Sequence, residues 1–160
     1  MTRIVPTRRH GVAAVEAAVV LPVLFLLIFG LVVGGMGVFH YEQVACLARE
    51  GARWASVRGS QYANETNQMS PTQQQIIEQA ILPMAVGMDP AAIIVQIVWV
   101  DQGTNTAWSW DTASKEFRSI TASGEYVSNT VQVTVSYQYT PGLFWGPITV
   151  QSVSKMPMSN

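Results

Sequence analysis

Residues 8–39 read RRHGVAAVEAAVVLPVLFLLIFGLVVGGMGVF, a short basic head followed by a long apolar run. The run from Val12 to Phe39 holds a single charged residue, Glu16. As a helix of about 28 residues it would be about 42 Å long, which exceeds the roughly 30 Å hydrocarbon core of a bilayer. We therefore predict one membrane-spanning helix over residues 12–39.

The apolar character of the chain is local to this run. The 160 residues are 49% hydrophobic and 12% charged, and the part outside the run has the composition of one ordinary polar domain. The net charge of −1 offers no basic field for nucleic acid, so we expect no nucleic-acid partner. Arg3, Arg8 and Arg9 precede the run, which favours a cytoplasmic N-terminus and a body carried across the membrane.

Two kinds of cleaved export signal compete with a permanent span, and both fit the residues poorly. A secretory signal has a shorter apolar run with small residues at its exit. A lipoprotein signal would use Cys46, but Gln43 stands where an apolar residue is expected. As the single cysteine, Cys46 also excludes an intramolecular disulfide and a multi-cysteine zinc site, and we expect it to be buried on a helix.

Glu16 is the residue that a plain single-pass anchor does not explain. A carboxylate inside an apolar helix costs on the order of 2.5 to 3.5 kcal/mol near the bilayer centre and less near an end, so such residues usually have a partner. Taken alone, Glu16 also fits a side chain that reaches the membrane surface or is protonated. Gly11 lies five residues before it, between the basic head and the apolar run, which favours a functional role.

The sequence GVAAVE at residues 11–16 resembles the prepilin peptidase site of type IV pilin-like proteins, which are cut after a glycine and carry a glutamate at the fifth mature position. Together with LAREGARWASVRG at residues 47–59, the segment resembles the TadE-like family, the minor pseudopilins of the Tad (Flp, tight adherence) pilus system. The chain departs from many relatives at Ala17, where they have an aromatic residue, and at residues 33–35. The matching features are Gly11, Ala14, Glu16, Leu21-Pro22, the aliphatic run to Gly30, and Ala48-Arg49-Glu50-Gly51-Ala52-Arg53.

This resemblance implies a pilin-like subunit of a Tad/Flp-type pilus or secretion system, involved in pilus assembly and surface adherence. Residues 1–11 would be a basic leader removed by prepilin peptidase, residues 12–39 a transmembrane helix in the bacterial inner membrane, and residues 40–160 a periplasmic body. The implied partners are prepilin peptidase, other pilin-like subunits, the Tad assembly platform and membrane lipid. The protein would stay in the membrane or become pilus-associated or extracellular after assembly.

The implied cut would create an ion pair that sets the register between subunits. It frees the α-amine of Val12, which is mostly protonated at neutral pH. A carboxylate and an ammonium attract strongly in a low dielectric, and either one left unpaired there is costly. We therefore expect Glu16 to pair with the Val12 amine of a neighbouring subunit.

Pro22, Gly30 and Gly34 are the residues that we expect to shape the packing of this helix. Pro22 removes one helix hydrogen bond and favours a bend around residues 19–22. Gly30 and Gly34 form a small-xxx-small pair that permits close approach of another helix in lipid, although such pairs are also frequent by chance.

Beyond Phe39 the sequence first predicts further helix. Small and apolar residues at spacings of three and four predict that the first helix continues to about Arg58. A polar loop is predicted over residues 61–69, followed by a second helix that is capped by Ser70 and ends near Gly87. The buried stripe of the first helix is expected to consist of Tyr41, Val44, Ala45, Ala48, Ala52 and Ala55.

The remaining residues predict a sheet. Residues 93–100 indicate a central strand buried on both faces, and residues 129–139 alternate apolar and polar side chains, as in a sheet with one wet face. Residues 148–156 indicate a last strand, and residues 103–128 a loop or hairpin insertion. We therefore predict an α+β fold in which the long helix packs on a small antiparallel sheet of three or four strands, with one further helix.

Trp108, Trp110 and Phe117 lie in the polar insertion, where they would either contact a partner or pack the insertion onto its own sheet. The sequence has no catalytic pattern, because His10 and His40 flank the span on opposite sides and no phosphate-binding loop or nucleophile elbow is present. We therefore expect no enzymatic activity, no cofactor and no metal.

Two other functions stay open at this point. One is an unprocessed, single-pass membrane-anchored periplasmic binding or adhesion domain, for which Gly11 and Glu16 would be dispensable and the 103–128 insertion would not. The other is an exported enzyme with its site in that insertion.

Overall fold

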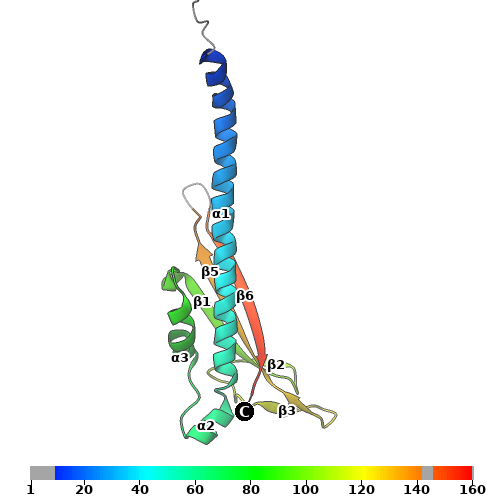
Figure 1. The fold of residues 1–160 in the computed structure, drawn as a ribbon. Helices are drawn as coiled ribbons and strands as arrows, with labels where there is room; N and C mark the ends of the chain where they lie inside the picture. Colours follow the sequence, from blue (N-terminus) through cyan, green and yellow to red (C-terminus); the bar gives the residue numbers. More distant parts are fainter. Residues whose placement is uncertain (1–9, 142–145, 160) are drawn as a thin grey trace, which may run out of the picture. The chain divides into compact units, whose positions relative to one another are not determined.

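The computed structural model describes residues 10–141 and 146–159, so residues 1–9 of the predicted leader lie outside the described residues. The fold is α+β, as the sequence predicts (Figure 1). The chain divides into two compact units, one ending at Val38 and the other beginning at Phe39. The described part of the first unit is helical, and the second contains two antiparallel sheets and further helices.

Helix α1 runs from His10 to Ser56 and is the longest element of the chain (Figure 1). It passes through Pro22 without interruption, although this residue has no N–H group to donate. The predicted continuation past Phe39 is confirmed. The helix ends two residues before Arg58, whose backbone N–H donates to the carbonyl of Ala55 at 3.1 Å.

The main sheet has four antiparallel strands in the order β2-β1-β5-β6 (Figure 1). Ile97 of β1 pairs with Val133 of β5, and Val133 pairs in turn with Ser154 of β6. The predicted central strand and the predicted last strand are therefore confirmed. The bounds of the strands are β1, Ile93–Asp101; β2, Thr106–Ser109; β5, Thr130–Tyr139; and β6, Ile148–Pro157.

Burial in the sheet follows the predicted alternation in β5 but not the prediction for β1. Val131, Val133 and Val135 are fully buried, whereas the residues between them are partly exposed. In β1, Ile94 on the outward face is 64% exposed, so the prediction that both faces are buried is wrong. The physical reason is that an antiparallel sheet covered by helices on one face leaves its other face to water.

The core of the second unit forms between this sheet and the last part of α1. Tyr41 is half-exposed rather than buried, since the adjacent His40 is the residue that packs against the rings of Tyr137 and Tyr139. Cys46 is exposed, contrary to the expected burial, because it lies about 200° around the helix from the buried residues two positions away. The confirmed members of the buried stripe are Val44, Ala45, Ala48, Ala52 and Ala55, and Leu47 is also buried.

The helices that follow α1 differ from the prediction. Helix α2, Ser60–Thr66, occupies most of the stretch predicted as a polar loop. The second predicted helix begins later, because Thr72 rather than Ser70 is its N-cap and forms a capping box with Gln75. The Ser70 hydroxyl instead donates to the carbonyl of Gly59 at 2.8 Å. This second helix consists of α3, Gln73–Ile76; a π turn, η1, Ile77–Ile81; and a 3-10 turn, η2, Leu82–Met84.

The insertion over residues 103–128 contains three short strands. Strand β2 extends the main sheet by pairing with β1, so that Trp108 lies opposite Trp99. Strands β3, Arg118–Ile120, and β4, Tyr126–Ser128, pair with each other in a separate two-stranded sheet. A short 3-10 turn, η3, Pro90–Ala92, precedes β1.

Candidate assembly surface on helix α1

The first unit exposes an apolar surface along its described length. Leu31 is 78% exposed, Val12 75% and Leu26 73%. Contiguous apolar surface of this extent is not typical of a soluble monomer and indicates contact with lipid or another protein. Within the described residues, α1 is the one helix long and apolar enough to cross a membrane, with a mean hydropathy of 2.8 in its most apolar window.

Glu16 shares one face of this helix with the predicted glycine pair. Val12, Glu16 and Val19 are three or four residues apart and line one shallow hollow. Gly34 follows Glu16 after about five full helical turns, and Gly30 lies only about 40° away around the helix. The acidic residue and both glycines therefore lie on one continuous face, which no single short motif reveals.

The carboxylate of Glu16 is exposed and has no hydrogen bond or ion pair among the described residues. The residues that line the hollow with it, Gly11, Val12, Val15 and Val19, offer no charged side chain. If this face lies in lipid, only another molecule or the membrane surface can satisfy the carboxylate.

The glycines of the first unit are not required by the packing of the chain itself. A Cβ atom added at Gly30, Gly34 or Gly35 meets nothing within 4 Å. Gly51 is different, because a Cβ atom there would lie 2.9 Å from Cδ1 of Ile81 in the core. Gly30 and Gly34 are thus open to another helix, whereas Gly51 lets α1 approach the body.

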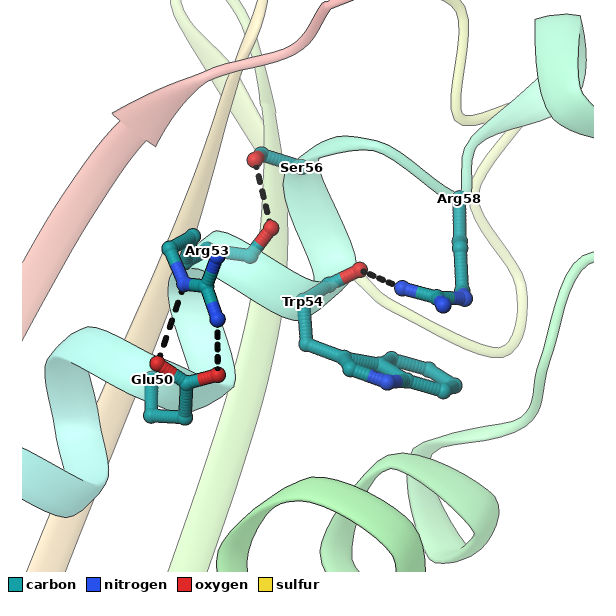
Figure 2. Close-up of polar contacts among 5 residues, drawn as sticks. All are labelled: Glu50, Arg53, Trp54, Ser56 and Arg58. Carbon is teal, nitrogen blue, oxygen red and sulfur yellow. Dashed lines mark hydrogen bonds and ion pairs between the residues drawn. The ribbon is translucent and has the colours of Figure 1, made fainter.

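The C-terminal end of α1 carries an exposed ion pair and a stacked arginine (Figure 2). Arg53 donates to the two carboxylate oxygens of Glu50 at 2.6 and 3.0 Å, and this hydrogen bonding lowers the pKa of Glu50. Arg58 donates to the carbonyl of Trp54 at 3.3 Å, with its guanidinium carbon 4.0 Å from the centre of the indole ring. The Ser56 hydroxyl donates to the carbonyl of Arg53 at 2.9 Å. The bonds from Ser56 and Arg58 go to backbone carbonyls in the last turn of α1, where a helix leaves carbonyls without partners.

The three aromatic residues expected as partner contacts have different surroundings. Trp110 is fully buried and its indole N–H donates to the carbonyl of Pro71 at 2.7 Å, so it packs the insertion onto the body. Phe117 is partly buried and packs against the core. Trp108 is 53% exposed and donates to the hydroxyl of Thr106 at 3.2 Å. Of the two alternatives for the insertion, Trp110 follows the packing one, and Trp108 has the most accessible ring of the three.

His40 is buried, which the spacing pattern did not predict. Its ring centre lies 4.7 Å from that of Tyr139 and 5.3 Å from that of Tyr137. Its position one turn before Val44 is the signal that places it on the buried stripe. In the described part of the chain, no group of three or more His, Cys, Asp or Glu side chains is arranged to hold a metal ion.

An apolar helix of membrane-spanning length, followed by a small α+β body, is consistent with a single-pass membrane anchor. The family model of the TadE-like proteins matches residues 11–53, which confirms the resemblance seen in the sequence: the chain is TadE-like over this segment. The TadE-like family suggests a pseudopilin-like protein associated with the Tad pilus. No curated protein and no solved structure matches the chain.

Proposed function

We propose that this chain is a pilin-like subunit of a Tad/Flp-type pilus or secretion system that prepilin peptidase cuts after Gly11. Residues 12–39 then anchor it in the bacterial inner membrane, and residues 40–160 form a body on the periplasmic side. The mature helix packs with other pilin-like subunits on the Tad assembly platform. In this way the protein takes part in pilus assembly and surface adherence, in the membrane or in the pilus.

One observation carries the proposal: the TadE-like match begins at Gly11, and five residues later an open apolar face bears a carboxylate that has no partner among the described residues. The Gly11–Val12 bond lies in the first turn of α1, where backbone N–H groups have no partners within the helix. Unwinding the helix around this bond, so that a peptidase can bind it, therefore breaks few hydrogen bonds. Glycine also offers no side chain that would hinder an extended conformation.

The proposed ion pair follows from the spacing of Val12 and Glu16. These residues are one helical turn apart, so the amine of one subunit reaches the carboxylate of a neighbour displaced along the helix axis by about 6 Å. Lipid excludes water from such a contact, which strengthens the attraction and penalises any register that leaves the carboxylate unpaired. The pair would thus select one stagger between adjacent helices.

Processing is expected to depend on Gly11. In cells with an active prepilin peptidase, a Gly11→Val chain should accumulate in its uncut form, with the processed fraction lowered by about tenfold or more, because valine places a bulky side chain beside the bond to be cut, where glycine places none. Intact-mass measurement of the protein from membranes gives the ratio of the two forms. Gly30→Val is the matched control, since a Cβ atom is equally unobstructed there. Equal processing of both variants would remove Gly11 from the peptidase site.

Helix association is expected to distinguish Gly34 from Gly35. A Cβ atom is unobstructed at both positions, but only Gly34 lies on the face of Glu16. Gly34→Leu should lower site-specific photo-crosslinking to the other pilin-like subunits of the same system by about tenfold, because it prevents close helix approach. Gly35 lies about 100° around the helix from Glu16, so Gly35→Leu should change the crosslinking by less than about twofold. The opposite order, or equal effects, would contradict the proposed packing face.

The unprocessed anchored binding domain remains the alternative function, and the 53% exposed ring of Trp108 favours it. It predicts normal activity of Gly11→Val and loss of activity on replacement of Trp108. The processing experiment above therefore separates the two functions.

A further inference from the structure

A polar cleft lies in the second unit, separate from the helix surface. Its volume is about 650 Å³, and it is lined by helix α2, the β3–β4 hairpin and the end of β1. Small-molecule sites in proteins typically have volumes of about 300 to 1,000 Å³. The side chains that bear on its chemistry are Asn64, Asp101, Glu116, Phe117, Arg118 and Tyr126.

One wall of the cleft is held by buried Asn129. The Nδ2 group of Asn129 donates to the carbonyl of Glu116 at 3.0 Å and to the hydroxyl of Ser119 at 2.8 Å. Its Oδ1 atom accepts from the backbone N–H of Gln102 at 2.9 Å. Because Asn129 is fully buried, this network fixes the backbone of residues 116–119 against the end of β1.

A second wall, formed by α2, is fixed at its first residue. The backbone N–H of Ser60 donates to the carbonyl of Lys115 at 3.0 Å. The preceding Gly59 lies so close that a Cβ atom there would be 2.6 Å from the same carbonyl. Both walls are therefore held by hydrogen bonds to buried Asn129 and to the backbone of Lys115, and the cleft is preformed.

Several polar groups in the cleft lack a partner within the described residues. The Asn64 amide and the Glu116 carboxylate take part in no hydrogen bond or ion pair there. Within the described residues, the Arg118 guanidinium has no carboxylate partner. Its central carbon lies over the rings of Phe117 and Tyr126, 4.8 and 5.0 Å from their centres. Asp101 is different, since its Oδ1 atom accepts from the backbone N–H groups of Gly103 and Thr104.

These groups provide one acceptor, one donor and one amide that is both, beside the exposed side chain of Tyr126. Adjacent hydroxyls of a sugar both donate and accept hydrogen bonds, and its C–H faces pack on aromatic rings. The two carboxylates outnumber the single guanidinium, so the lining disfavours an anionic ligand. We infer that this cleft binds a neutral saccharide. The inference is independent of the processing and assembly proposed above.

A titration of the full-length protein in lipid nanodiscs, prepared without sugar-based detergents, tests this inference. Saturation-transfer NMR is recorded with N-acetylchitotriose, maltotriose and the anionic trigalacturonate as probes. We expect saturable binding of at least one neutral trisaccharide in the millimolar range and binding of trigalacturonate weaker by about tenfold. Absence of saturable binding for both neutral probes, or stronger binding of trigalacturonate, would overturn the inference.

Variants locate the binding site. Glu116→Gln and Arg118→Met should each weaken saccharide binding by about tenfold, because each removes a charged hydrogen-bonding group from the cleft. Glu125→Gln is the matched control: it is an exposed carboxylate of the same insertion that does not line the cleft. Circular dichroism on heating confirms that each variant is folded, and amide shifts of the unaltered protein on titration report the site without any mutation. Amide shift changes confined to residues outside the cleft would contradict binding in the cleft. Equal saccharide binding by Glu116→Gln and Glu125→Gln would also contradict it.

Discussion

Replacing Glu16 by glutamine is expected to abolish co-assembly with the other pilin-like subunits while membrane insertion persists. Glutamine keeps the shape of the side chain but removes the charge that we propose pairs with the Val12 amine of a neighbour. Breaking a buried ion pair by removing one partner costs about 3 to 5 kcal/mol, which corresponds to a loss of more than about a hundredfold in association. Photo-crosslinking between helices in native membranes measures this loss directly.

Two controls make the Glu16 result specific. Glu42→Gln removes another exposed carboxylate of α1, in the second unit, and should leave co-assembly unchanged. The N-terminus of the Glu16→Gln chain is determined in the same preparation, so that a defect in cutting is distinguished from a defect in packing. A Glu16→Gln chain that is cut and co-assembles normally would exclude the ion pair as the determinant of register.

Replacing Trp110 by alanine is expected to have the largest effect on the stability of the body. The ring is fully buried in the core, and its N–H satisfies the carbonyl of Pro71. Removal of a buried Trp side chain costs about 3 to 5 kcal/mol, a large part of the roughly 5 to 15 kcal/mol that stabilises a typical domain. Pulse proteolysis of the full-length protein across a urea series gives the change in the free energy of unfolding.

Trp108→Ala is the matched comparison within the same strand region. Its ring is 53% exposed, so we expect a change in the free energy of unfolding within about 0.5 kcal/mol. Similar decreases in the free energy of unfolding for the two variants would contradict the assignment of Trp110 to the core. If a partner binds the insertion, Trp108→Ala should weaken the binding of that partner without unfolding the body.

Features with a strong local period could be predicted from the sequence. The apolar run through Phe39 determines a long helix, and the alternation from Val131 to Tyr139 determines which face of β5 is buried. Both patterns depend only on the geometry of one element, 3.6 residues per helical turn or two per strand repeat. The β-branched run at residues 93–100 also indicated a central strand, but not how many of its faces the helices would cover.

Features that depend on contacts between distant residues could not be predicted in this way. Helix α2 forms in a stretch of polar residues because Ser60 and Gly59 are held against Lys115, far along the chain. Thr72 displaced Ser70 as the helix cap because the Ser70 hydroxyl bonds to Gly59 instead. Both outcomes are tertiary effects that override local propensity.

The same distinction applies to the candidate sites. Glu16, Gly30 and Gly34 lie on one helix, so their common face follows from the sequence once the helix is known to be continuous. The cleft combines α2, the β3–β4 hairpin and the end of β1, so no sequence spacing brings Asn64 and Arg118 together. The burial of Trp110 beside the exposure of Trp108 likewise follows from the fold and not from composition.

We propose that one peptide bond, Gly11–Val12, divides this chain into a leader and a mature subunit. The N-terminus of the protein isolated from host membranes that contain active prepilin peptidase, determined by intact mass and terminal sequencing, tests this claim most directly. The account predicts a mature chain that begins at Val12. A chain that begins at Met1 in those membranes, or at any residue beyond Val12, would contradict it.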